Sequence, residues 1–128
     1  MARVRSLVLM LVMVGAVSHA DNTADEADIA FSRGVQAYTK RDYEGALSNY
    51  FLSYRLVPNR NVLFNIARCY EALDRFDEAY RYWNDLYVDP SLPDSDRRDV
   101  KSAVNRLAPK VSLFSVVSTP PVAELYVE

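Results

Sequence analysis

Apolar residues in the middle of the chain recur with helical spacing, and the pattern repeats at a fixed separation in sequence, the one between Phe31 and Phe64. We call this separation the repeat offset. Residues 29–40, 43–57, 62–73 and 76–88 each place apolar side chains at spacings of one, three and four, which predicts four amphipathic helices. A lone helical hairpin cannot bury its apolar face, so two copies predict stacked hairpins with a shared core. The matching pairs are Phe31 and Phe64, Gly34 and Ala67, Tyr43 and Phe76, Glu44 and Asp77, Ala46 and Ala79, and Tyr50 and Trp83.

Two features of the copies bear on how the helices meet. Two-residue links at 41–42 and 74–75 join the helices within each copy, and Asp42 is placed to cap the helix that follows it. Gly34 lies in the middle of a helix, where glycine costs about 1 kcal/mol relative to alanine. We therefore expect a neighbouring helix to approach closely at this glycine.

A fifth helix is predicted after the second copy, over residues 91–109. It carries a single apolar stripe and an otherwise charged surface, which is typical of a helix that covers the open end of a helical stack. Pro109 is expected to end it. The stripe consists of Val100, Ala103, Val104 and Leu107.

The end of the chain, residues 110–128, changes in character. Residues 111–117 are rich in β-branched side chains, residues 122–127 alternate in part, and a proline-containing turn lies between them. This pattern predicts a short β-hairpin-like tail. Two strands alone are marginally stable in water, so the tail is either the start of a larger β-module or a hairpin that leans on the helices.

The first twenty residues have the layout of a secretory signal peptide. Basic residues come first, an apolar run follows at 7–17, and small residues precede a predicted cleavage after Ala20. Residues 21–28 then form a flexible mature N-terminus that leads into the first helix. The alternative is an inner-membrane anchor at 7–17, but this run is shorter than the roughly 20 residues of a spanning helix.

Composition excludes several classes of function. The net charge is −2 with interleaved signs, so no basic surface for nucleic acid is expected. The only histidine, His19, is lost with the signal peptide, and Cys69 is the only cysteine. A nucleophilic triad or a zinc site of cysteine and histidine therefore cannot form. We predict no catalytic residues, no metal ligands and no small-molecule cofactor.

The duplicated hairpins resemble the tetratricopeptide repeat (TPR) family, whose pattern runs from Leu-Gly through Tyr and Ala-x-x-x-Phe to Pro over about 34 residues. This resemblance implies a mainly α fold over residues 29–109, with two helix-turn-helix repeats in a right-handed superhelical stack and a C-terminal covering helix. Arg33 and Ala37 depart from the pattern in the first copy, and Ala67 replaces its glycine in the second. The matching residues are Gly34, Ala46, Tyr50 and Pro58 in the first copy and Ile66, Tyr70, Ala79 and Trp83 in the second.

The tail resembles the start of a PEGA domain, a small β-module of exported bacterial proteins. The resemblance rests on the stretch Pro120-Pro121-Val122-Ala123, in which a proline and an alanine agree and the glycine of the motif is missing. A TPR segment followed by such a tail is similar to proteins of the bacterial cell envelope.

In TPR proteins the first helix of each repeat lines a concave groove, so the resemblance implies where a partner binds. The implied binding residues, which we call the groove face, are Phe31, Tyr38, Asn61, Asn65 and Arg68. The family's carboxylate clamp is not expected, because Phe31 and Val35 replace the lysine and asparagine that it needs in the preceding repeat.

Each of these assignments has a structural alternative. Phe31 and Phe64 can pack between helices, and Asn65 can bond the backbone. Cys69 is expected to be a buried small residue rather than a reactive thiol.

Together these features predict a non-enzymatic, exported TPR scaffold that holds a protein or peptide partner in the periplasm. The alternatives are a structural component of the cell envelope, or an accessory domain of a larger enzyme or complex. Two repeats are fewer than the three usually needed for independent stability, so a homo-oligomer is also considered.

Overall fold

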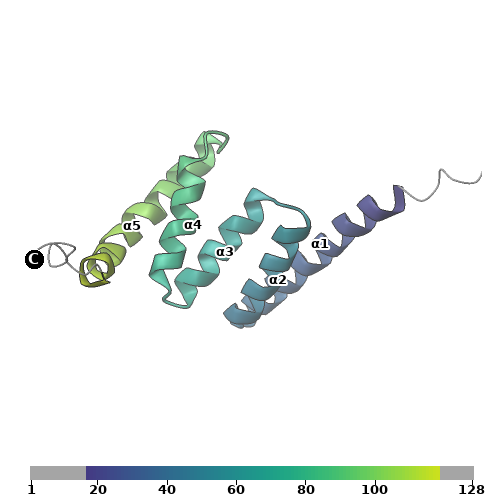
Figure 1. Ribbon diagram of the computed structural model, residues 1–128, viewed down its shortest axis with the longest axis horizontal. Helices are drawn as coiled ribbons and strands as arrows, with labels where there is room; N and C mark the ends of the chain where they lie inside the picture. Colours follow the sequence, from purple (N-terminus) through teal and green to yellow (C-terminus); the bar gives the residue numbers. More distant parts are fainter. Residues whose placement is uncertain (1–16, 119–128) are drawn as a thin grey trace, which may run out of the picture.

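The structure, a computed structural model, describes the backbone of residues 17–118 and the side chains of residues 22–111. This part of the chain forms five helices and no strand. They follow one another in a single row, and each packs mainly against the next (Figure 1). The predicted mainly helical fold is confirmed, and the row of helices is compatible with a helical repeat. The helices are α1 (Val17–Thr39), α2 (Tyr43–Leu56), α3 (Arg60–Ala72), α4 (Phe76–Val88) and α5 (Asp94–Ser118).

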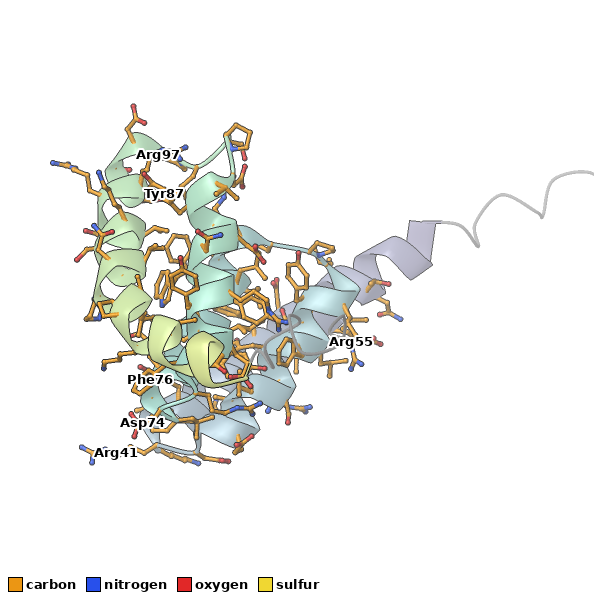
Figure 2. The ribbon with its side chains drawn as sticks, turned by 60° about the vertical axis from the view of Figure 1, so that its left-hand side comes forward. Arg41, Arg55, Asp74, Phe76, Tyr87 and Arg97 are labelled. Carbon is orange, nitrogen blue, oxygen red and sulfur yellow. The ribbon has the colours of Figure 1, made fainter. Side chains whose placement is uncertain are left out.

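The links inside the two hairpins have the same backbone geometry. Arg41 and Asp74, which are separated by the repeat offset, both lie in the left-handed region, with φ of 62° and 56°. Each is followed by a residue whose N–H bonds to a carbonyl five positions back, Asp42 to Ala37 and Arg75 to Tyr70, at 2.9 Å in both cases. This is the Schellman ending of a helix. Figure 2 places Arg41 and Asp74 at the same end of the stack.

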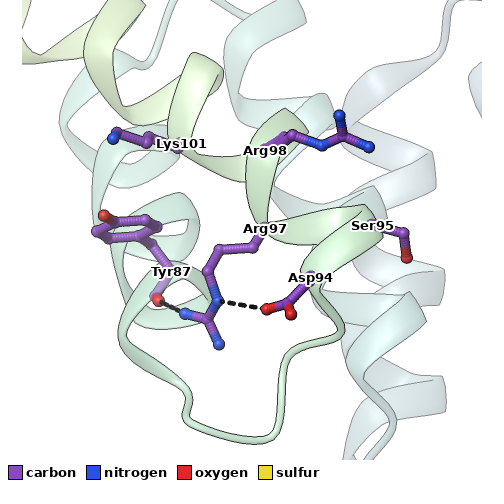
Figure 3. Close-up of a pocket in the computed structure, with 6 residues that line it drawn as sticks. All are labelled: Tyr87, Asp94, Ser95, Arg97, Arg98 and Lys101. Carbon is purple, nitrogen blue, oxygen red and sulfur yellow. Dashed lines mark hydrogen bonds and ion pairs between the residues drawn. The ribbon is translucent and has the colours of Figure 1, made fainter.

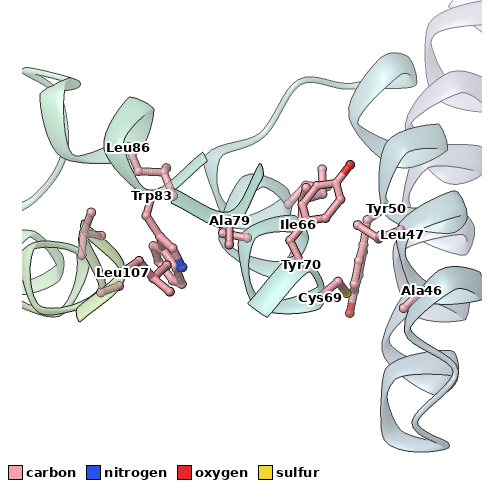
Figure 4. Close-up of a cluster of buried hydrophobic side chains, with 14 of the residues drawn as sticks. Ala46, Leu47, Tyr50, Ile66, Cys69, Tyr70, Ala79, Trp83, Leu86 and Leu107 are labelled. Atoms are coloured by element: carbon pink, nitrogen blue, oxygen red, sulfur yellow. The ribbon is translucent and has the colours of Figure 1, made fainter. Parts of the chain in front are cut away.

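The matching core residues also lie in matching surroundings. Ala46 and Ala79 are both fully buried, and Tyr50 and Trp83 are 1% and 6% exposed. The buried side chains run continuously from α2 through α3 and α4 to α5 (Figure 4). The sequence duplication is therefore a structural duplication with one continuous core.

Gly34 has the close neighbour that its position in the sequence predicts. A Cβ atom built on Gly34 would lie 2.6 Å from two ring carbons of Tyr50 on α2. Only a residue without a side chain lets the ring lie against the α1 backbone at this point.

Val100 on α5 stands one repeat offset after Ala67 on α3. Both residues are fully buried. The sequence predicted the apolar stripe of the covering helix but not this third match. Ala103 and Leu107 are buried beside it, and Val104 is half-buried against the same core. The helix that covers the stack therefore occupies the place where a third repeat would begin.

The N-terminal end differs from the prediction in one respect. Residues 21–28, expected to be a flexible N-terminus leading into the first helix, belong to helix α1, which begins at Val17. Ala27 is 4% exposed and Ala30 is 2% exposed, so the buried stripe of α1 begins before Ile29. Burial of this small-residue stripe extends the helix toward the N-terminus.

The C-terminal end differs more. Helix α5 does not end at Pro109 but continues to Ser118, so residues 111–117 are helical rather than a strand. Proline removes one backbone N–H and crowds the preceding turn, and α5 changes direction in its last turns (Figure 2). β-branched residues cost a helix only a few tenths of a kcal/mol each, which is less than the hydrogen bonds that the continued helix retains. The predicted second strand and the PEGA-like stretch lie outside the described residues.

Candidate functional site

The groove face comes from two helices that do not pack extensively on each other. Helices α1 and α3 both pack on α2, and neither is held mainly by the other. Phe31 and Tyr38 lie on α1, whereas Asn61, Asn65 and Arg68 lie on α3. Asn61 and Arg68 are exposed, and the other three are half-buried.

Both aromatic residues at the repeat-equivalent position pack inside their own hairpin. The Phe31 ring lies 5.5 Å from the Tyr50 ring, and the Phe64 ring lies 5.6 Å from the Trp83 ring, centroid to centroid. This repeated ring pair supports the structural interpretation of these phenylalanines. Phe31 is nevertheless only partly covered.

Two of the groove-face residues also have local structural contacts. The side-chain amide of Asn65 donates to the carbonyl of Asn61 at 2.8 Å. The Tyr38 ring packs edge-on against Tyr43 with centroids 5.2 Å apart. The alternative interpretation of Asn65, a bond to the backbone, is therefore confirmed.

Tyr38 and Arg68 influence the same buried hydroxyl. The pKa of Tyr50 is raised to about 12, mainly by burial and less by electrostatic interaction with Cys69 and Tyr38, while Arg68 acts in the opposite direction. These four side chains thus share one electrostatic environment between α1, α2 and α3. Tyr50 stays protonated at neutral pH, and its role there is packing.

A cavity of about 200 Å³ opens between α1, the end of α2 and the start of α3; we call it the α1–α3 cavity. It brings together Phe31 and Asn61 from the two repeats. Tyr38, Asn65 and Arg68 do not line it. The lining residues are Ala27, Asp28, Phe31, Ser53, Val57, Asn59, Asn61 and Val62.

Sequence analysis missed part of this lining. Asp28 stands one repeat offset before Asn61, so the duplication alone could have identified it. Ser53 and Val57 come from the end of α2, and no repeat position of the groove points to them. Their position at the cavity depends on the angle between the two hairpins. The sequence pattern does not predict this angle.

The side chain of Glu71 on α3 joins three helices. Its carboxylate accepts a hydrogen bond from the Trp83 indole at 2.5 Å. Arg106 on α5 donates to both of its oxygens at 2.9 Å. Glu71 therefore fastens the covering helix to the second repeat and is not available to a partner.

A second, more open depression of about 530 Å³ lies where α4 meets α5 (Figure 3). Arg97 is its most engaged cation: its guanidinium donates to the carbonyls of Tyr87 at 2.7 Å, Asp89 at 3.1 Å and Leu92 at 3.0 Å. These include carbonyls at the end of α4, where no helical partner remains. Arg97 thus caps the C-terminal end of α4. The depression is lined by Tyr87, Asp94, Ser95, Arg97, Arg98 and Lys101.

The groups that carry chemistry in other proteins are few in the described part of the chain. Burial raises the pKa of the Cys69 thiol to about 12, so the thiolate that would act as a nucleophile does not form at neutral pH. Within residues 22–111 no three His, Cys, Asp or Glu side chains gather at a metal-binding distance. No helix in the described residues is long and apolar enough to cross a membrane, and the anchor considered at 7–17 lies largely outside them.

Comparison with known proteins finds no matching protein family, no matching curated protein and no matching solved structure. The resemblances to the TPR family and to the PEGA domain therefore stay predictions from the sequence. The function has to be argued from the cavity and its surroundings.

Proposed function

We propose that this chain is a helical-repeat scaffold that binds an extended segment of a protein partner across α1 and α3, and that it is not an enzyme. The α1–α3 cavity carries this proposal. It joins two predicted groove residues, Phe31 and Asn61, from different repeats. A concave site with an apolar floor and a few polar groups is the usual form of a binding pocket. At about 200 Å³ it suits one side chain of a longer ligand.

The repeats themselves are proposed to be TPR-like and to stack with a right-handed superhelical turn. The support is that residues separated by the repeat offset have the same structure. This holds for the Schellman links, for the buried alanines and for the aromatic ring pairs. Arrays of such repeats present their first helices along one surface. That arrangement supports a ligand crossing α1 and α3 rather than lying along one helix.

A displayed library of random peptides, selected against the purified chain, tests binding. Asn61→Arg places a long side chain at the mouth of the cavity, and Gln36→Arg adds the same side chain at an exposed position of α1 outside it. We expect selected peptides to bind the Asn61→Arg variant at least about tenfold more weakly, the effect of about 1.4 kcal/mol. Circular dichroism confirms that both variants are folded. Equal binding by both variants, or no selected peptide at all, contradicts the proposal.

The cellular place of this binding is proposed to be the periplasm, supported by the signal-like layout of the first twenty residues. Sequencing the N-terminus of the protein recovered from a periplasmic extract tests this directly. A mature start at Asp21 is expected. Recovery of the full-length chain from the membrane fraction supports the anchor at 7–17 instead.

A further inference from the structure

The polar groups of the α1–α3 cavity are the starting point. Asp28 and Asn61 stand at its sides, and Ser53 lines it from the end of α2, while Phe31 and Val57 contribute apolar surface. A carboxylate accepts hydrogen bonds only, and a hydroxyl and an amide oxygen accept them as well. The cavity therefore offers three acceptors next to an apolar wall.

Ser53 is the most informative of these groups. It is the one buried polar residue within the described side chains, at 3% exposure. Its backbone carbonyl accepts from Val57. Within the described side chains the buried polar atom without a partner is Arg60 Nε, and the Ser53 hydroxyl is not one. Because Ser53 lines the cavity, its hydroxyl can accept a hydrogen bond from a ligand that enters there.

The charge of the cavity favours a cation. Asp28 is its only charged lining residue, and no basic side chain in the described part of the chain forms an ion pair with it. Asp25 and Glu26 lie beside it on the exposed face of α1 and add to the negative potential. The apolar wall requires the cation to sit at the end of an aliphatic stem.

We propose that the α1–α3 cavity binds the lysine side chain of a peptide partner. Lysine has a four-carbon stem and three ammonium donors, which correspond to the apolar wall and to the three acceptors of Asp28, Ser53 and Asn61. This inference rests on the proposed function, because it names which residue of the bound segment the cavity takes.

The test uses small blocked amino acids as probes. Nα-acetyl-lysine-N-methylamide and its norleucine, arginine and glutamate counterparts are titrated into the ¹⁵N-labelled chain. The amide signals of Phe31, Ser53 and Asn61 are followed by NMR. We expect saturable shifts of these signals with the lysine probe and binding up to about fivefold weaker with norleucine, because about fivefold is the upper range for an exposed ion pair.

Two matched variants separate this site from general attraction of cations. Asp28→Asn removes the lining carboxylate, and Asp25→Asn removes the same charge from an exposed position of α1 that does not line the cavity. Asp28→Asn should weaken the lysine probe about fivefold and leave norleucine unchanged. Asp25→Asn should leave both nearly unchanged.

Several results overturn the inference. These are equal binding of lysine and norleucine, tighter binding of arginine or glutamate than of lysine, or the same loss in Asp28→Asn and Asp25→Asn. If selected peptides still lose affinity in Asn61→Arg but carry no lysine, the proposed function stands and the lysine pocket is wrong. If no peptide depends on the cavity, both are wrong.

Discussion

The contact between Gly34 and Tyr50 gives the sharpest prediction about stability. Alanine at position 34 would gain about 1 kcal/mol of helix propensity. Its methyl group would lie 2.6 Å from the Tyr50 ring, where ordinary contact begins at 3.4 Å. Tyr50 is 1% exposed and surrounded by core residues, so the ring or the helix must move by about 0.8 Å.

The magnitude follows from two opposing effects. Overpacking of a dense core costs about 1–3 kcal/mol, which exceeds the gain in helix propensity. We expect Gly34→Ala to lower the free energy of unfolding by about 1 kcal/mol, which corresponds to a melting temperature lower by about 4–8 °C for a domain of this size. Urea unfolding followed by the fluorescence of Trp83, the only tryptophan, and by circular dichroism measures it.

A double-mutant cycle isolates the steric cause. In a Tyr50→Leu background the ring is gone, so Gly34→Ala should become stabilising by up to about 1 kcal/mol. At the equivalent position of the second repeat, Ala67→Gly should lower the free energy of unfolding by about 1 kcal/mol, because glycine has a lower helix propensity than alanine. If Gly34→Ala stabilises the native chain as much as the Tyr50→Leu chain, the ring does not exclude a side chain at position 34.

Three further outcomes follow from the links, the helix end and the buried thiol. Arg41→Gly and Asp74→Gly should each raise the free energy of unfolding by about 0.5–1 kcal/mol in urea titrations, because left-handed backbone disfavours any side chain; a loss in either would contradict the repeated geometry. Arg97→Met should lower it by about 2 kcal/mol by removing the hydrogen bonds to three carbonyls, of which the one on Asp89 keeps the Leu92 N–H as a donor, whereas the exposed Arg98→Met should change it little; equal effects would show that these bonds do not stabilise the fold. Cys69 should resist a thiol reagent at pH 8 until the chain unfolds, since burial raises its pKa to about 12; rapid labelling of the folded chain would refute its burial.

The repeat offset predicted most of the helical core. Ala46 and Ala79 were expected in equivalent places and are both fully buried, and the expected close approach at Gly34 is present. Asp42 caps α2 as expected, by accepting a hydrogen bond from the N–H of Gly45 at 3.0 Å. Such features depend on spacing within one helix or one hairpin, which the sequence states directly.

The predictions from the sequence failed where contacts between distant parts of the chain, or opposing energetic effects, determine the structure. Pro109 looked like a helix end, yet α5 continues past it, because one lost hydrogen bond does not outweigh the turns that follow. Two of the five groove-face residues line the α1–α3 cavity, and Ser53 joins them from α2, a helix that contributes no predicted groove residue. The angle between the two hairpins determines which residues line the cavity. The spacing of apolar residues within a helix does not determine this angle.

The order of packing along the row determines how this chain opens. Within the described residues each helix is held mainly by its neighbours in sequence, so α3 has a helix on either side, whereas α1 and α5 have one each. Solvent should therefore reach the backbone amides of the outer helices first, and exchange with deuterium should slow from both ends toward α3. Detachment of α1 alone would dismantle one wall of the α1–α3 cavity while leaving the second hairpin folded.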